Sequence, residues 1–143
     1  YGGDEEATAA AMLPGGWLRT GDMVRRRDSF LWMADRRREL ILTGGFNVYP
    51  SQVEAAIGDM EAVSDVAVVG LDSGASGELV CAAVVLEPGA PQDAVTLESV
   101  RSHAERALPH YALPRRLEII DEMPRSTVGK VLRRVVRERI QGR

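Results

Sequence analysis

The sequence contains one cysteine, one lysine and few aromatic residues, which make up 5% of the chain. Cys81 has no partner for an internal disulfide, so a reducing, cytoplasmic environment is expected. No apolar run approaches the ~20 residues that a helix needs to cross a bilayer, and the N-terminus lacks the pattern of a signal peptide. The chain begins at Tyr1 without a methionine, and we expect it to be part of a longer protein.

Several common functional motifs are also missing. No GxGxxG, HExxH or CxxC occurs, and His103 and His110 are too isolated for a typical zinc site, so no metal site is predicted. The net charge of −3 argues against a basic nucleic-acid binder. The predicted strands carry few of the aromatics that stack RNA bases, so an autonomous α/β RNA-binding module is the least favoured alternative.

What is present predicts a globular α/β (α+β) fold. Hydrophobic residues make up 45% and charged residues 27% of 143 residues, which suits one domain, or one domain with an appendage. Short strands alternating with helices predict a small C-terminal domain with a central three-stranded sheet flanked by helices, preceded by a β-hairpin. The three strands are expected in SDVAVVGL, LVCAAVVLE and RLEII.

The expected elements have recognisable boundaries. The first lasting order is expected in the hairpin of MVRRR and FLWMA, and a short strand is expected at residues 40–42. A helix should follow Pro50, with Ser51 and Glu54 at the spacing of a capping box. Further helices are expected from Thr96 to about residue 108 and from Lys130 to about residue 140.

Lys130 is the only lysine, and the other seventeen basic residues are arginines. A GC-rich genome explains the arginine bias, which leaves Lys130 either as a remnant or as a site that needs a compact ammonium. A Walker A loop is excluded because its required Gly and Ser/Thr positions are Pro124 and Val131. The small polar residues that precede Lys130 form a loop that could carry its side chain into a cleft.

Two further stretches carry signals that are weak alone. Asp22 ends GWLRTGD, where it can accept hydrogen bonds from vicinal hydroxyls or serve as a cap or turn residue. The pair Gly44-Gly45 allows a ligand to approach the backbone closely, or forms a tight turn.

Together these stretches resemble three motifs of the adenylate-forming acyl-CoA synthetase superfamily, in the order found there. GWLRTGD is similar to the motif whose Asp binds the ribose of ATP. DRRRELILTGGFNVYPSQVE is similar to the hinge-and-glycine motif, and PRSTVGK to the closing motif with the catalytic lysine. The DR pair, the GFNVYP turn and SGASGE most resemble bacterial long-chain fatty-acid CoA ligases.

The resemblance implies a two-step reaction and a domain division. A carboxylate attacks the α-phosphate of Mg·ATP to give acyl-AMP and pyrophosphate, and the CoA thiol then displaces AMP. Residues 1–34 would end the large N-terminal domain, residues 35–38 would form the hinge, and residues 39–143 would form the small mobile C-terminal domain. Most of the active site would lie in the missing N-terminal domain, its main partner, so the fragment alone is expected to be inactive.

The resemblance also assigns roles to individual residues. Lys130 would bridge the carboxylate and the α-phosphate as the adenylation catalyst. Asp22 would hold the ribose, and Arg36 would lie by the ribose and phosphates. For the second step the domain would rotate about Arg38, and the turn of Gly44 and Gly45 would admit the pantetheine arm, with Gly45 lining its tunnel.

The same resemblance bounds the ligands and leaves alternatives open. The substrates would be a carboxylic acid, ATP with Mg²⁺, and CoA, without a tightly bound cofactor and without nucleic acid. An adenylation domain that loads a carrier-protein phosphopantetheine fits the same motifs, and peripheral membrane association of the full-length enzyme is left open. The chain departs from the family at Arg38, usually Lys or Asp, and at Ala112, usually Lys. Glu54 and Tyr111 would support the motifs. Cys81 lies in a predicted strand, where we expect it to be a small packed or edge residue.

Overall fold

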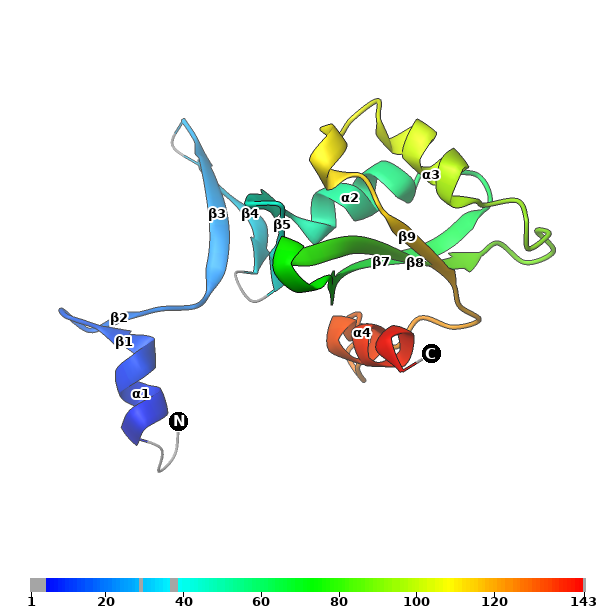
Figure 1. Cartoon of the computed structure of the whole chain (residues 1–143). Helices are drawn as coiled ribbons and strands as arrows, with labels where there is room; N and C mark the ends of the chain where they lie inside the picture. The colour runs from blue at the N-terminus through cyan, green and yellow to red at the C-terminus, as the bar shows by residue number, and fades with distance from the viewer. Residues whose placement is uncertain (1–4, 29, 37–38, 143) are drawn as a thin grey trace. The chain divides into compact units, whose positions relative to one another are not determined.

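The computed structural model describes residues 5–28, 30–36 and 39–142, and the chain divides into two compact units, Tyr1–Arg38 and Glu39–Arg143. The second unit is built on a three-stranded sheet (Figure 1). Its strands are β7 (Val63–Asp72), β8 (Glu78–Leu86) and β9 (Arg116–Ile119), in the order β7-β8-β9. β7 and β8 are antiparallel, whereas β9 pairs in parallel with β8 after a crossover that contains a helix, as parallel pairing requires.

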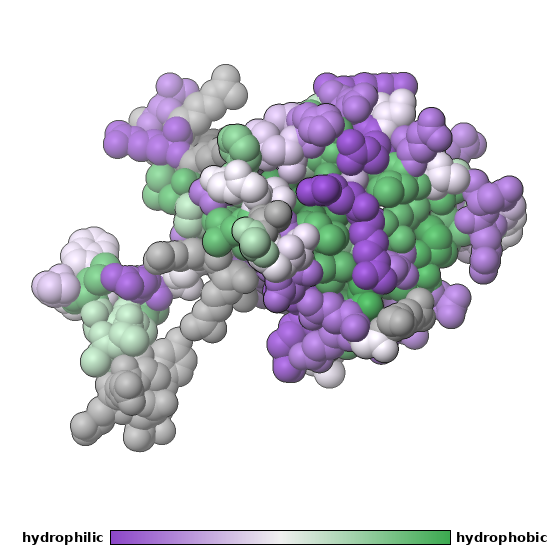
Figure 2. All heavy atoms as spheres, viewed as in Figure 1, coloured by the Kyte–Doolittle hydropathy of each residue, from purple (hydrophilic) through white to green (hydrophobic). Residues whose placement is uncertain are grey.

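Helices cover both faces of this sheet. α2 (Pro50–Ile57) and α3 (Leu97–Ala104) lie on one face, and α4 (Arg133–Gln141) lies on the other (Figure 1). Successive residues of the central strand β8 alternate between two hydrophobic clusters and are buried on both faces. Figure 2 shows hydrophobic residues gathered in the middle of the visible face of this unit, with hydrophilic residues around them. The unit therefore has a core on each side of its sheet.

The second unit also contains a short hairpin and two 3-10 turns. β5 (Ile41–Thr43) and β6 (Phe46–Val48) form a hairpin, in which Ile41 and Val48 are opposite one another and belong to the cluster under α2. The 3-10 turns η2 (Gly74–Ser76) and η3 (His110–Ala112) connect the larger elements. Gly77 has a φ of 82°, and a Cβ there would lie 2.6 Å from the Leu42 carbonyl oxygen, so the approach of β5 to β8 requires glycine.

The described residues of the first unit form a short helix and two hairpins. α1 (Glu5–Ala11) leads into β1 (Met12–Leu13) and β2 (Trp17–Leu18), which pair with one another. β3 (Asp22–Arg27) and β4 (Phe30–Arg36) form the longer hairpin, and its register shifts between Met23 and Val24. No helix in the described part of the chain is long and apolar enough to cross a membrane.

The predicted fold class is confirmed, including the three-stranded sheet, the flanking helices and the hairpin before them. The expectation that order begins at the MVRRR hairpin is wrong, because α1, β1 and β2 precede it. The capping box predicted for Ser51 and Glu54 at the start of α2 is also wrong. Tyr49 is the N-cap of α2 without a side-chain hydrogen bond, and Glu54 makes other contacts. By contrast, Thr96 caps α3 as predicted, although this helix ends at Ala104.

Candidate functional site

Lys130 lies in a tight hairpin of residues 124–132, directly before α4, and its side chain is exposed. The Ser126 N–H donates to the Lys130 carbonyl at 2.8 Å, and the Lys130 N–H donates to Ser126 Oγ at 3.1 Å. The Leu132 N–H donates to the Pro124 carbonyl at 2.8 Å, which closes the hairpin at its base. Because these bonds replace helical ones, the predicted helix start at Lys130 is wrong and α4 begins at Arg133.

Arg125 braces this hairpin from its first strand. Its Nη1 donates to the Gly129 carbonyl at 2.7 Å, immediately before Lys130 in the chain. Its Nη2 lies 2.5 Å from Asp65 Oδ2, at the start of β7. The sequence predicted a small polar loop here, and the structure adds an ion pair that joins the loop to the sheet.

The Gly44-Gly45 pair forms the two-residue turn of the β5–β6 hairpin. Their φ angles are 54° and 82°, and positive φ at both central positions is the pattern of a type I′ hairpin turn. A Cβ at either position would meet nothing within 4 Å. Glycine is therefore required by the backbone conformation, and the space beside the turn is open to an approaching chain.

An aromatic pair lies beside this turn. The rings of Phe46, the residue after Gly45, and Tyr111 in η3 stack with centroids 4.4 Å apart and planes 11° from parallel. Both side chains are exposed, at 53% and 41% of their full area. The stack joins the glycine hairpin to η3. Ala112, in the position where the family commonly has lysine, is buried in the core.

The structure also pairs two predicted site residues of the first unit. Asp22 and Arg36 are opposite one another in the register of β3 and β4, at the end of the hairpin away from its turn. Asp22 is half-buried, and its N–H donates to Thr20 Oγ1 at 3.3 Å. Arg38, the predicted hinge residue, lies outside the described residues.

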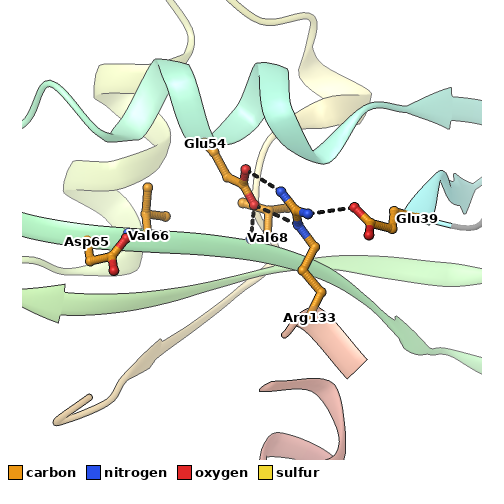
Figure 3. A network of polar contacts seen from close by, with 6 residues as sticks. All are labelled: Glu39, Glu54, Asp65, Val66, Val68 and Arg133. Atoms are coloured by element: carbon orange, nitrogen blue, oxygen red, sulfur yellow. Dashed lines mark hydrogen bonds and ion pairs between the residues drawn. The ribbon is translucent and has the colours of Figure 1, made fainter. Parts of the chain in front are cut away.

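Arg133, which follows Lys130 closely in the chain, is the centre of a polar network that the sequence did not predict (Figure 3). Arg133 donates to Glu54, from Nε to Oε1 at 3.0 Å and from Nη2 to Oε2 at 2.7 Å. Its Nη1 donates to Glu39 Oε2 at 2.5 Å. Glu54 Oε1 also accepts the Val68 N–H at 2.9 Å, which satisfies a backbone donor on the edge strand β7. No sequence signal distinguished Arg133 from its neighbouring arginines.

A second missed network involves Glu78, at the start of β8. Its Oε2 accepts the Leu42 N–H at 3.1 Å, and its Oε1 lies 3.1 Å from Arg137 Nη1. This carboxylate therefore joins β5 to α4. His103 contacts Asp59 with 2.6 Å between Nε2 and Oδ1 and so joins α3 to the residues that follow α2.

Cys81 is fully buried on β8, as a packed residue. Burial raises the pKa of its thiol from 9.0 to about 12, the nearby Arg116 acts in the opposite direction, and Glu118 adds a smaller increase. A thiol with this pKa is protonated at neutral pH and is not a nucleophile. Across residues 5–28, 30–36 and 39–142, no cluster of three His, Cys, Asp or Glu residues could hold a metal ion.

The three-layer fold, the Lys130 hairpin and the glycine turn together define a small α/β domain of the type found in adenylate-forming enzymes. Residues 52–130 match the family described as AMP-binding enzyme C-terminal domain. The chain belongs to this family.

Named relatives act on different acids. The long-chain-fatty-acid–CoA ligase of Escherichia coli O6:H1 is 40% identical over 133 residues, which cover 92% of this chain and 23% of that protein. The 2-succinylbenzoate–CoA ligase of Geobacillus sp. (strain WCH70) is 38% identical over 136 residues, covering 94% and 27%. The solved Mycobacterium tuberculosis fatty acyl CoA synthetase has a TM-score of 0.74 at 36% identity, covering 96% of this chain and 26% of that one. The chain thus spans about a quarter of the length of these relatives.

Proposed function

We propose that this chain is the C-terminal domain of an ATP-dependent acyl-CoA ligase that activates a long-chain fatty acid and transfers it to CoA. The observation that carries the proposal is the single lysine, exposed on a braced hairpin within a chain of this family. A fatty acid is proposed because the Escherichia coli relative bears that name and shares 40% identity over most of the chain.

In the first half-reaction, Lys130 supplies a cation to the developing charge between the substrate carboxylate and the α-phosphate of Mg·ATP. A preorganised cation or donor of this kind typically contributes ~10²–10³ in rate. An ammonium is a compact point charge, whereas a guanidinium is a wide planar fork, which explains why an arginine-rich chain keeps lysine here. Asp22 accepts hydrogen bonds from the ribose hydroxyls, and Arg36 neutralises charge near the phosphates.

In the second half-reaction, the domain rotates about residue 38, Lys130 leaves the reaction centre, and the glycine turn takes its place. The open space beside Gly44 and Gly45 accommodates the pantetheine arm, because no side chain occupies it. CoA and a carrier-protein phosphopantetheine present the same arm, so the turn suits either acceptor. A cytoplasmic location is proposed with this function, and the buried, reduced Cys81 is compatible with it.

The test uses the full-length ligase with Mg·ATP, a series of straight-chain fatty acids, one aromatic carboxylate, and either CoA or a holo-carrier protein. Mass spectrometry of the products should detect fatty acyl-CoA, with AMP and pyrophosphate formed in equal amounts. If the acyl group were transferred to the carrier protein and no acyl-CoA were formed, the chain would instead belong to a carrier-loading adenylation enzyme. Turnover of the aromatic acid alone would overturn the fatty-acid assignment.

A further inference from the structure

The hairpin of residues 124–132 is stiff within itself but projects into solvent. Internal hydrogen bonds join Ser126 to Lys130 and Leu132 to Pro124, whereas Val128 at its tip is 77% exposed. A hairpin of this kind moves as one piece about its base. The direction in which Lys130 points therefore depends on the contacts that hold the base.

Two arginines hold this base, and they are not equivalent. Arg125, on the first strand of the hairpin, pairs with Asp65 of β7, and the two side chains are 44% and 27% exposed. Arg133 follows the second strand and bonds Glu54 through two nitrogens, with side chains 23% and 17% exposed. Exposed single ion pairs contribute little, whereas bidentate, partly buried guanidinium–carboxylate pairs are stronger and fix geometry. Arg133 is therefore the stronger of the two contacts.

Arg133 also reaches a second acidic residue. Glu39, 30% exposed, accepts its remaining terminal nitrogen and lies one position after the predicted hinge residue. The guanidinium, seen between the two carboxylates in Figure 3, links the start of α4 with α2 and with the segment that follows the hinge. A rotation at the hinge would thus be transmitted directly to the base of the Lys130 hairpin.

We propose that Arg133 is a positioning residue for adenylation: its bridge between Glu54 and Glu39 holds the Lys130 hairpin in the orientation that the first half-reaction needs. This inference rests on the proposed function of Lys130. The glycine turn does not depend on the bridge, because buried Ile41 and Val48 hold its hairpin together with the Phe46 stack. Loss of Arg133 should therefore slow adenylation and leave thioester formation unchanged.

The substitution is expected to leave the domain folded. Val136 and Ile140 keep α4 packed on the sheet, and Arg137 still pairs with Glu78 one turn further along. Arg134 supplies a matched control, since it is adjacent to Arg133, its side chain is 84% exposed, and it forms an ion pair with Glu138 within the same helix. Replacing it removes the same charge from α4 without touching the bridge.

The experiment compares Arg133→Gln, Arg133→Lys, Glu39→Gln and Arg134→Gln in the full-length ligase. Carboxylate-dependent ATP–pyrophosphate exchange reports the first half-reaction, and thioester formation from supplied acyl-adenylate reports the second. For Arg133→Gln, kcat of exchange should fall about 10- to 100-fold, the loss expected from a small misplacement of a catalytic group. The KM for ATP and the thioester rate should match the wild type. Arg133→Lys and Glu39→Gln should lose less exchange activity than Arg133→Gln, and Arg134→Gln should retain wild-type rates in both assays.

Equal losses in both half-reactions, or an exchange rate that Arg133→Gln leaves unchanged, would overturn the positioning role. A fall in the thermal midpoint of Arg133→Gln that accounts for lost activity in both assays would do the same. If the wild-type enzyme itself shows no carboxylate-dependent exchange, the proposed function of the chain fails instead.

Discussion

The two rarest side chains of the sequence, Lys130 and Cys81, have opposite environments. Lys130 is exposed on a hairpin that hydrogen bonds to its own backbone stabilise, so its ammonium faces solvent. Cys81 is 0% exposed between α4 and the sheet, where burial favours the neutral thiol. Rarity in composition therefore coincides with exposure in one case, where we propose a catalytic role, and with packing in the other.

The buried environment of Cys81 predicts that the free energy of unfolding depends on pH in the alkaline range. Because burial raises its folded-state pKa from 9.0 to about 12, the unfolded chain loses the thiol proton first as pH rises. The contribution of Cys81 to the free energy of unfolding is thus complete below pH 9.0 and is lost as pH rises towards 12. Urea unfolding of the wild type and Cys81→Ala at several pH values should show a steeper alkaline decline for the wild type.

Alkylation provides an independent check of the same environment. Cys81 should not react with iodoacetamide in native protein at pH 8, whereas it should be alkylated in protein unfolded in urea. Rapid modification of the folded chain would contradict a buried, protonated thiol.

At the scale of elements, sequence patterns predicted what depends on local residues and failed where distant contacts decide. Runs of β-branched residues located β7 and β8, and Thr96 located the start of α3. The Ser51–Glu54 spacing suggested a cap, but Glu54 is engaged by Val68 and by Arg133, which is 79 positions away in the chain. Such partners leave no trace in local spacing.

Local sequence patterns were also insufficient for part of the first unit and for part of the candidate site. β1 and β2 have only two residues each and are exposed, so they offer no hydrophobic alternation to detect. The motifs predict roles for Lys130, Asp22 and the glycine pair, because each motif is a short stretch of sequence. The Arg133 bridge joins three segments far apart in the chain, and only the folded structure brings them together.

The glycine turn carries a prediction of its own. In the full-length ligase, Gly45→Leu should slow thioester formation from acyl-adenylate more than it slows ATP–pyrophosphate exchange, because the new side chain fills the space proposed for the pantetheine arm. Gly89→Leu is the matched control, since Gly89 has a similar φ of 86° and equally open surroundings in another loop. Equal losses in both half-reactions, or the same selectivity in Gly89→Leu, would argue against a role for the turn in binding this arm.

At the scale of the whole molecule, the two features to which we assign the half-reactions lie on elements that pack against different faces of one sheet. The Lys130 hairpin leads into α4, whose apolar residues join one hydrophobic cluster, and the glycine hairpin joins the other. Ion pairs from Arg133 and Arg137 link α4 to α2 and to the start of β8. A unit held together in this way can present one feature or the other by rotating as a body, without refolding.

The central claim is that Lys130 serves adenylation and not thioester formation. The most direct measurement compares both half-reactions in full-length wild type, Lys130→Ala and Lys130→Arg. We predict that Lys130→Ala lowers carboxylate-dependent ATP–pyrophosphate exchange by at least ~10²-fold, that Lys130→Arg fails to restore it, and that all three proteins form thioester from supplied acyl-adenylate at similar rates. Normal exchange by Lys130→Ala would contradict the assignment.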